Sequence, residues 1–211
     1  MTASDTITLF HSPNTRSTGT LRLLEELGAP YELHVLNMQA GEQRQPAYLA
    51  VNPMGKVPAI RHGDALITEQ VAIYLYLADL FPEAGLAPGL SDTRRGPYLR
   101  WMVFYAACFE PAAVDKAMKR DPGPAMMSPY GDFETVMSTV TNQLEAGPYI
   151  LGADFTAADV LWGSALEWMT AFGIVDASPV VKAYVERVCS RPAILRVKQK
   201  DSELAARHKP S

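Results

Sequence analysis

Glu69 and Gln70 stand where an apolar helical run begins, in the stretch TEQVAIYLYLADLF that Pro82 follows. Backbone N–H groups at the start of a helix have no partner within it, and the helix dipole makes this end positive. A carboxylate binds well at such an end. These two residues are therefore candidates for binding a ligand that carries a carboxylate. The alternative is that Glu69 is an ordinary first-turn acid that complements the dipole.

Pro58 interrupts a second stretch, KVPAI at 56–60, which otherwise has the composition of a strand. Proline has no N–H to donate to a sheet, so it is usually confined to sheet edges, bulges and strand starts. From these five residues alone, the favoured interpretation is that Pro58 simply ends a strand.

A third stretch, HSPNTRS at 11–17, places several hydroxyl and amide side chains in one turn. It follows a β-rich run and precedes a helical one. Serine, asparagine and threonine in such a turn commonly cap the following helix. Without further information, capping is the favoured interpretation.

Composition limits the function classes. The chain has 211 residues, of which 48% are hydrophobic and 20% charged, so it is long enough for one large or two small globular domains. A net charge of -4 excludes a basic nucleic-acid footprint. No apolar run approaches the roughly 18 residues of a membrane span, and the N-terminus resembles no secretory signal. The two cysteines are far apart and the four histidines lack metal-ligand spacing, which favours a cytoplasmic protein with free thiols and no metal.

The first part of the chain alternates between strand and helix patterns. Strands are predicted at 6–11, 31–35, 57–61 and 65–67, and helices at 20–27, 44–51 and 68–81. The order is β-α-β-α-β-β-α. A right-handed crossover makes the first two strands parallel, and a turn at 62–64 makes the last two an antiparallel hairpin.

After residue 90, the strand patterns stop. The Gly- and Pro-rich segment 83–92 reads as a linker, and an apolar-periodic stretch follows over 94–119 with a kink predicted at Pro111. Ser128 and Ser178, each followed by proline, are predicted helix starts. Thr156 and Asp159 form a capping-box pattern, so their predicted role is structural. The expected division is a domain at 1–82, a linker at 83–92 and an all-helical domain at 93–211.

With these elements in order, the sequence resembles the soluble glutathione transferases over nearly its whole length. Three stretches carry the resemblance: NPMGKVPAI at 52–60, TEQVAIYLYLADLFP at 68–82 and GADFTAADVLWGSAL at 152–166. The resemblance implies an α/β thioredoxin-like N-terminal domain followed by an all-α C-terminal domain. It also implies a homodimer with one glutathione site per subunit, and glutathione as a co-substrate without a permanently bound cofactor.

The resemblance implies a role for the segment around Pro58 and for the helix start at Glu69 and Gln70. In this family the proline equivalent to Pro58 is cis, which would turn the Val57 N–H and C=O toward the backbone of glutathione. Glu69 would bind the γ-glutamyl ammonium and Gln70 the carboxylate. Gln70 departs from the family pattern, because many members have serine there. For the glycyl carboxylate, Lys56 is the main candidate, and Gln43 and Arg44 are the others.

The group that activates the thiol is sought in HSPNTRS. This turn has neither tyrosine nor cysteine, so the classes that use those residues match poorly. By position, the serine of the serine-type classes falls on Asn14, and the cysteine of a bacterial class falls on Arg16. Asn14 or Thr15 is the preferred hydrogen-bond donor to the thiolate, supported by Ser17 and the helix start.

The second substrate is expected to be a small apolar electrophile. Tyr105 and Phe109 are the candidates for its pocket, although an aromatic stripe at helical spacing is more often part of a core. The main functional hypothesis is glutathione conjugation, as in detoxification. A glutathione-dependent disulfide reductase or peroxidase, and a non-enzymatic glutathione-binding protein, are the alternatives.

Overall fold

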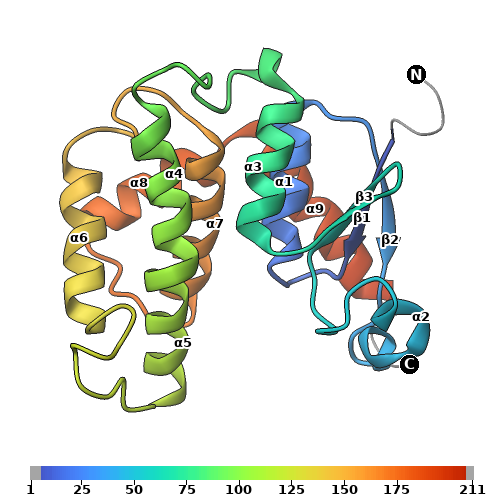
Figure 1. Cartoon of the computed structure of the whole chain (residues 1–211), viewed down its shortest axis with the longest axis horizontal. Helices are drawn as coiled ribbons and strands as arrows, with labels where there is room; N and C mark the ends of the chain where they lie inside the picture. The colour runs from blue at the N-terminus through green and yellow to red at the C-terminus, as the bar shows by residue number, and fades with distance from the viewer. Residues whose placement is uncertain (1–5, 208–211) are drawn as a thin grey trace. The chain divides into compact units, whose positions relative to one another are not determined.

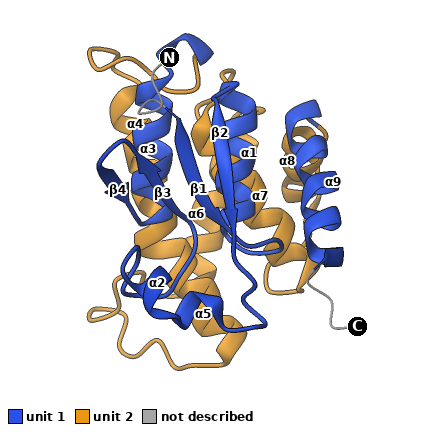
Figure 2. Cartoon of the chain, turned by 90° about the vertical axis from the view of Figure 1, so that its right-hand side faces the viewer, with its two compact units in different colours: residues 1–84, 191–211 blue, residues 85–190 orange. Residues whose placement is uncertain are grey.

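The computed structural model describes residues 6–207, which fall into two compact units. Unit 1 comprises residues 1–84 and 191–211, and unit 2 comprises residues 85–190 (Figure 2, blue and orange). The expected domain division placed everything from 93 to 211 together. The structure instead groups the last helix with the first part of the chain.

Unit 1 is a four-stranded mixed sheet with helices on both faces (Figure 1). The strand order is β2-β1-β3-β4. β1 and β2 are parallel and β3 and β4 are antiparallel, as the sequence predicted, and β1 also pairs with β3 in antiparallel register. The observed element order confirms β-α-β-α-β-β-α. Its strands are β1 (Ile7–His11), β2 (Tyr31–Val35), β3 (Ala59–His62) and β4 (Ala65–Ile67), and its helices are α1 (Ser17–Leu27), α2 (Pro46–Leu49), α3 (Gln70–Leu80) and α9 (Pro192–Arg207).

Alternation along β1 explains how both faces of the sheet become covered. Phe10 packs against Tyr48 of α2, with ring centroids 5.8 Å apart. Ile7 and Leu9 alternate with Phe10 along the strand, so they face the opposite side of the sheet, where α1 and α3 lie. Both are fully buried. Because side chains alternate across a strand, a β-rich run with apolar residues at successive positions is compatible with burial on both sides.

Two boundaries differ from the sequence prediction. α1 begins at Ser17, three residues before the predicted start at Thr20, because tertiary contacts bury the side chains of its first turn. β3 begins at Ala59, and the peptide bond between Val57 and Pro58 is cis, which confirms that expectation.

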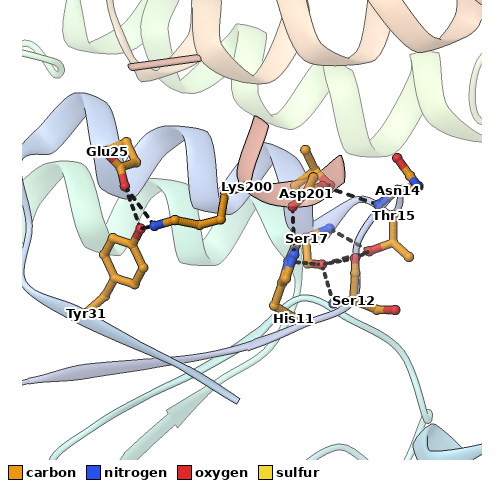
Figure 3. A network of polar contacts seen from close by, with 10 residues as sticks. His11, Ser12, Asn14, Thr15, Ser17, Glu25, Tyr31, Lys200 and Asp201 are labelled. Carbon is orange, nitrogen blue, oxygen red and sulfur yellow. Dashed lines mark hydrogen bonds and ion pairs between the residues drawn. The ribbon is translucent and has the colours of Figure 1, made fainter. Parts of the chain in front are cut away.

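Charged side chains join α9 to the part of unit 1 formed by α1 and β2. Arg191, just before α9, forms an ion pair with Glu26 at 2.7 Å. Lys200 donates to the hydroxyl of Tyr31 at 2.6 Å and to Glu25 at 3.3 Å, as the left half of Figure 3 shows. These contacts explain why α9 belongs to unit 1 although it lies at the far end of the sequence.

Asp201 adds a buried anchor to the same helix. Its side chain is 4% exposed and accepts hydrogen bonds from His11 Nε2 at 2.9 Å, from the Thr18 hydroxyl and from the Asn14 N–H at 3.3 Å. Burial alone would raise the pKa of Asp201, but its hydrogen bonds, above all the one from His11, outweigh burial and hold the pKa below its ordinary value. The carboxylate therefore stays ionised near neutral pH.

Unit 2 is helical throughout its regular elements (Figure 1). Where the sequence predicted a kink at Pro111, the chain forms a π-helical turn, Tyr105–Phe109, between two α-helices. Proline cannot donate to the fourth preceding carbonyl and its ring crowds that group, so a wider turn accommodates it. The helices are α4 (Arg95–Phe104), α5 (Glu110–Met118), α6 (Phe133–Glu145), α7 (Ala157–Ala171) and α8 (Pro179–Cys189).

Helix starts in unit 2 test the predicted caps. The prediction at Ser128 was wrong, because α6 begins at Phe133 and the Asp132 side chain accepts from the Thr135 N–H at 2.7 Å. Asp132 precedes the helix directly and reaches the unpaired N–H, which Ser128 is too far away to do. Ser178 does precede α8, with Pro179 as its first residue.

The capping box of α7 is confirmed and its acid is buried. Asp159 accepts from the Thr156 N–H at 2.8 Å, and its other oxygen accepts from the Ile150 N–H at 2.7 Å and the Tyr184 hydroxyl at 2.9 Å. Gly163, one turn further along α7, lets α8 approach closely, since a Cβ there would lie 2.5 Å from Val188 Cγ1. Both features are structural.

The first prediction concerns this cap. Thr156→Ala should lower the free energy of unfolding by about 0.5–2 kcal/mol, the usual effect of losing a helix cap. Asp159→Ala should cost more, because each buried donor that loses its acceptor costs about 1–3 kcal/mol. Denaturant unfolding measures both, with Ser138→Ala on the exposed side of α6 as control. Unfolding midpoints equal to that of the parent would contradict the assignment.

The second prediction concerns Asp201. Because its pKa is lower in the folded protein than its ordinary value of 3.8, the stabilisation is complete above that value and is lost as the pH falls through the folded pKa. The free energy of unfolding, measured from about pH 6 to about pH 2.5, should therefore fall less steeply in Asp201→Asn than in the parent. Asp64→Asn, in the exposed turn between β3 and β4, is the control for the same charge change. A parallel pH profile for Asp201→Asn would contradict the prediction.

Candidate active site

The three stretches singled out in the sequence meet at one edge of the unit 1 sheet. Phe10 pairs with Ala59 in the antiparallel ladder, so the residues that follow β1 run beside those that precede β3. The Gln70 side chain at the start of α3 donates to the Arg16 carbonyl at 3.3 Å. The turn, the Val57–Pro58 corner and the start of α3 therefore border a common region.

The backbone of Val57 is positioned to pair with an extended ligand. Within residues 6–207, the sheet ladder begins at Ala59, and no backbone hydrogen bond outside the ladder involves the Val57 N–H or C=O. The preceding carbonyl, that of Lys56, is fixed by the Tyr48 hydroxyl at 2.6 Å and by Asn52 Nδ2 at 2.9 Å. Burial raises the pKa of Tyr48 to about 12, so its hydroxyl remains a donor at physiological pH.

Gly55 controls the approach to this corner. It has a φ of +60°, and a Cβ there would lie 2.8 Å from the Gln43 carbonyl oxygen. A glycine is needed for both reasons. This close approach places Gln43 and Arg44 beside the loop that precedes Lys56. Arg44 Nη1 donates a hydrogen bond to the Met54 carbonyl in that loop at 3.4 Å. The three candidates for a glycyl carboxylate thus come from adjacent segments, and Lys56 is exposed.

Glu69 occupies an unusual backbone conformation at the cap position of α3. Its φ is +64° and its ψ is 114°, although it is not a glycine. A non-glycine residue in such a region costs about 1–3 kcal/mol and is often found where function requires a particular side-chain or backbone direction. The side chain is exposed. This backbone conformation favours a functional role for Glu69 over the alternative that it only complements the helix dipole.

Ser17 faces the interior of the turn. It is fully buried, and its Oγ lies 2.9 Å from His11 Nδ1 and 2.7 Å from Thr15 Oγ1 (Figure 3). The Ser12 N–H donates to the same oxygen at 3.1 Å. Because these contacts satisfy the Ser17 hydroxyl within the protein, a ligand would interact with it only indirectly, through the residues bonded to it.

Thr15 and Asn14 lie nearer the surface. The Thr15 hydroxyl is half-buried and donates to the Ser12 carbonyl at 2.7 Å. Asn14 is exposed, with a left-handed φ of +57°, which asparagine tolerates better than most residues. Its side chain is directed outward from the network in Figure 3, while its backbone N–H donates to Asp201.

His11 and Asp201 are the site residues that sequence reasoning missed. The sequence showed His11 only as one of four histidines without metal-ligand spacing, and it gave no reason to single out Asp201. The two are 190 positions apart, and their contact depends on how α9 packs in unit 1. No local pattern could have identified them as partners.

Tyr105 and Phe109 are both buried in unit 2. Their rings pack against Trp162, with centroid separations of 5.5 Å and 4.9 Å. Phe109 is fully buried. This packing fits the alternative that the aromatic stripe is core, and the role of these rings in binding an electrophile stays a prediction.

Other kinds of site are not found in the described part of the chain. No helix within residues 6–207 combines the length and apolar character needed to cross a membrane. Over the same residues, no group of three or more histidine, cysteine, aspartate or glutamate side chains is arranged to hold a metal ion.

Comparison with family models matches both parts of the chain. The model described as "Glutathione S-transferase, N-terminal domain" matches residues 5–79, and "Glutathione S-transferase, C-terminal domain" matches residues 130–187. The first match includes the turn, the Val57–Pro58 corner and the start of α3. The second includes the α7 capping box.

Individual relatives agree over nearly the full length. Glutathione S-transferase GstA of Escherichia coli O157:H7 is 27% identical, over 88% of this chain and 94% of the relative. The crystal structure of a glutathione transferase from Methylococcus capsulatus is 28% identical with a TM-score of 0.80, over 93% of this chain and 99% of that one. A glutathione transferase homologue from Sulfitobacter, with bound glutathione, is 29% identical with a TM-score of 0.74, over 92% and 98%. With these matches and the fold of both units, the chain belongs to the glutathione S-transferase family.

Proposed function

We propose that the protein is an enzyme that binds glutathione at this edge of the unit 1 sheet and conjugates its thiolate to small apolar electrophiles. The observation that carries the proposal is the convergence of three elements: a backbone open to strand-like pairing at Val57, a helix start with Glu69 and Gln70, and a turn rich in donors. A tripeptide with a free carboxylate and ammonium at one end complements all three. Family membership supports the same chemistry.

In the proposed complex, the cysteinyl backbone of glutathione pairs with the Val57 N–H and C=O, as an added strand would. The γ-glutamyl carboxylate lies at the N-terminus of α3, where the backbone of Gln70 supports it, and Glu69 binds the ammonium. The Gln70 side chain already donates to Arg16, so it braces the turn and leaves carboxylate binding mainly to its N–H. Lys56 neutralises the glycyl carboxylate.

Thiol activation requires only a modest free energy. A free cysteine thiol titrates near 8.5, and each pKa unit corresponds to about 1.36 kcal/mol. One hydrogen bond to a charged group contributes about 1.5–3 kcal/mol, which lowers the thiol pKa by about one to two units. We assign this donor role to Thr15 or Asn14, which lie nearer the surface, with Ser17 acting behind them.

Conjugation is favoured over reduction of disulfides by a cysteine mechanism. The turn has Arg16 where a cysteine-using class has its nucleophile, and both cysteines of this chain, Cys108 and Cys189, belong to unit 2. A peroxidase or reductase that relies on glutathione alone, and a non-enzymatic binding protein, remain the alternatives that an activity panel distinguishes. An aryl halide, a mixed disulfide and a hydroperoxide should each be tested, and turnover of the aryl halide is expected.

The wider assignment follows the same family proposal. Residues 1–82, together with α9, would provide the glutathione site, 83–92 the linker and the helices of unit 2 the electrophile pocket, with Tyr105 and Phe109 as its candidate residues. We propose a cytoplasmic homodimer that acts in detoxification.

The third prediction tests the γ-glutamyl end. Glu69→Ala should weaken glutathione binding by about 1–3 kcal/mol, because the ligand ammonium would lose its charged partner. Isothermal calorimetry measures the change. Glu32→Ala, on the exposed side of β2, removes the same charge from unit 1 and should bind like the parent. Equal affinities for parent and Glu69→Ala would rule out this assignment.

The fourth prediction tests the donor. Thr15→Val keeps the size of the side chain and removes its hydroxyl, and Asn14→Ala removes the amide. The variant that lacks the true donor should raise the pKa of bound glutathione by about one unit and lower turnover below that pKa about tenfold. Ultraviolet absorbance of the thiolate against pH measures the shift. Two variants that both titrate like the parent would show that neither residue activates the thiol.

A further inference from the structure

A continuous chain of short contacts runs from the surface of the turn into the interior of unit 1 (Figure 3). Thr15 Oγ1 lies 2.7 Å from Ser17 Oγ, and Ser17 Oγ lies 2.9 Å from His11 Nδ1. His11 Nε2 lies 2.9 Å from Asp201 Oδ1. Thr15 is half-buried, whereas His11 and Ser17 are fully buried and Asp201 nearly so. These contacts thus connect Thr15, which a ligand can reach, to His11 and Asp201, which a ligand cannot reach.

The partners of His11 determine the direction of the hydrogen bonds. An ionised carboxylate can only accept, so His11 Nε2 carries a hydrogen and donates it to Asp201. In the neutral imidazole, Nδ1 is then an acceptor, and the Ser17 hydroxyl donates to it. The Ser17 oxygen can in turn accept from the Thr15 hydroxyl, which also has the Ser12 carbonyl within reach at 2.7 Å. The Ser17 hydroxyl also has the Ser12 carbonyl within reach, at 3.1 Å. The path is therefore complete when the Thr15 hydrogen points to Ser17 Oγ and the Ser17 hydrogen points to His11 Nδ1, rather than to that shared carbonyl.

The charge of Asp201 makes the inner end of the path receptive to a proton. His11 is the partner of this buried carboxylate that can become cationic, and the other donors in the described contacts are a hydroxyl and a backbone N–H. The next cation along α9, Lys200, is engaged by Glu25 and Tyr31 instead. A buried charge is costly unless an opposite charge accompanies it. Protonation of His11 would provide that charge.

We propose that the His11–Asp201 pair takes up the proton that glutathione loses when its thiolate forms, through the hydroxyls of Thr15 and Ser17. This rests on the proposed function, which places the thiol beside Thr15. The S–H bond breaks and its proton passes to Thr15 Oγ1. The Thr15 hydrogen passes to Ser17 Oγ, and the Ser17 hydrogen passes to His11 Nδ1. Both hydroxyls end neutral, and the products are a thiolate and an imidazolium paired with Asp201.

The surroundings of His11 hold its ring between Asp201 and Ser17. From α9 the facing titratable group is Asp201, and from α1 the contact is the Ser17 hydroxyl. On the side of β2, the Leu36 N–H donates to the His11 carbonyl at 2.8 Å and fixes the backbone. His11 does not touch the sulfur itself, so it is a positioning residue that acts through Thr15 and Ser17.

The direct test follows the histidine resonances of the parent protein by NMR while glutathione is added at neutral pH. The His11 ring signals, assigned with His11→Gln, should shift to the imidazolium position in proportion to the thiolate seen by ultraviolet absorbance. S-methylglutathione has no thiol proton, so it should bind without moving these signals. Thiolate formation in the parent while none of its histidine resonances moves to the imidazolium position would overturn the proposal, and this outcome needs no variant.

Calorimetry in buffers of different ionisation enthalpy gives a second readout, the number of protons released per glutathione bound. The parent should release far fewer protons than the thiolate it forms, because His11 retains them. His11→Gln keeps hydrogen-bonding groups but cannot hold the proton, so it should release one proton per thiolate and raise the thiol pKa by about one unit, a tenfold loss of thiolate at lower pH. His62→Gln, a histidine bonded to Tyr76 outside this chain of contacts, is the matched control and should behave like the parent.

The outcomes separate the two proposals. If His11 has only a structural role, His11→Gln will weaken glutathione and S-methylglutathione equally and leave the proton count unchanged, and the relay is refuted. If the parent binds no glutathione, or binds it without forming thiolate, the proposed function fails instead. If the parent forms thiolate and releases a full proton for each one, the function stands and the relay is wrong.

Discussion

A buried carboxylate with few donors is the constraint on which the site geometry depends. Asp201 comes from the last helix, and its negative charge must receive hydrogen bonds because water cannot reach it. Its donors come from the end of β1, from the turn and from the first turn of α1. Satisfying one side chain therefore fixes three consecutive segments at once. The turn would otherwise be a short exposed loop with several available conformations.

This constraint also explains why the hydroxyls of the turn differ in role. Residue type alone ranks Ser17 and Thr15 equally as donors. Once His11 is held by Asp201, its Nδ1 faces Ser17 and occupies that hydroxyl, so the helix begins at Ser17 with a buried side chain. Thr15, two residues earlier, stays within reach of the surface. The orientation of each hydroxyl is therefore determined by the buried group that it contacts, not by its residue type.

Local patterns were sufficient to predict most of the fold. The parallel β1–β2 pair, the β3–β4 hairpin and the α7 capping box depend on periodicity, on short turns and on caps that lie within a few residues of one another. The prediction failed where a nearer competitor or a distant partner decided the outcome. Asp132 displaces Ser128 as the α6 cap because it directly precedes the helix. The placement of α9 in unit 1 depends on ion pairs with Glu25 and Glu26, more than 160 positions away in sequence.

The same distinction divides the candidate site. Its binding corner at Val57 and Pro58 is built by neighbours, with Asn52 and Tyr48 holding the Lys56 carbonyl, so a short motif suffices to locate it. Its reactive end depends on a contact between the two extremes of the chain. A sequence comparison that aligns the turn residue by residue looks for a single activating side chain there. The proposed relay instead distributes the acid–base chemistry between Thr15 near the surface and His11 behind it, and the packing of α9 places Asp201 beside that histidine.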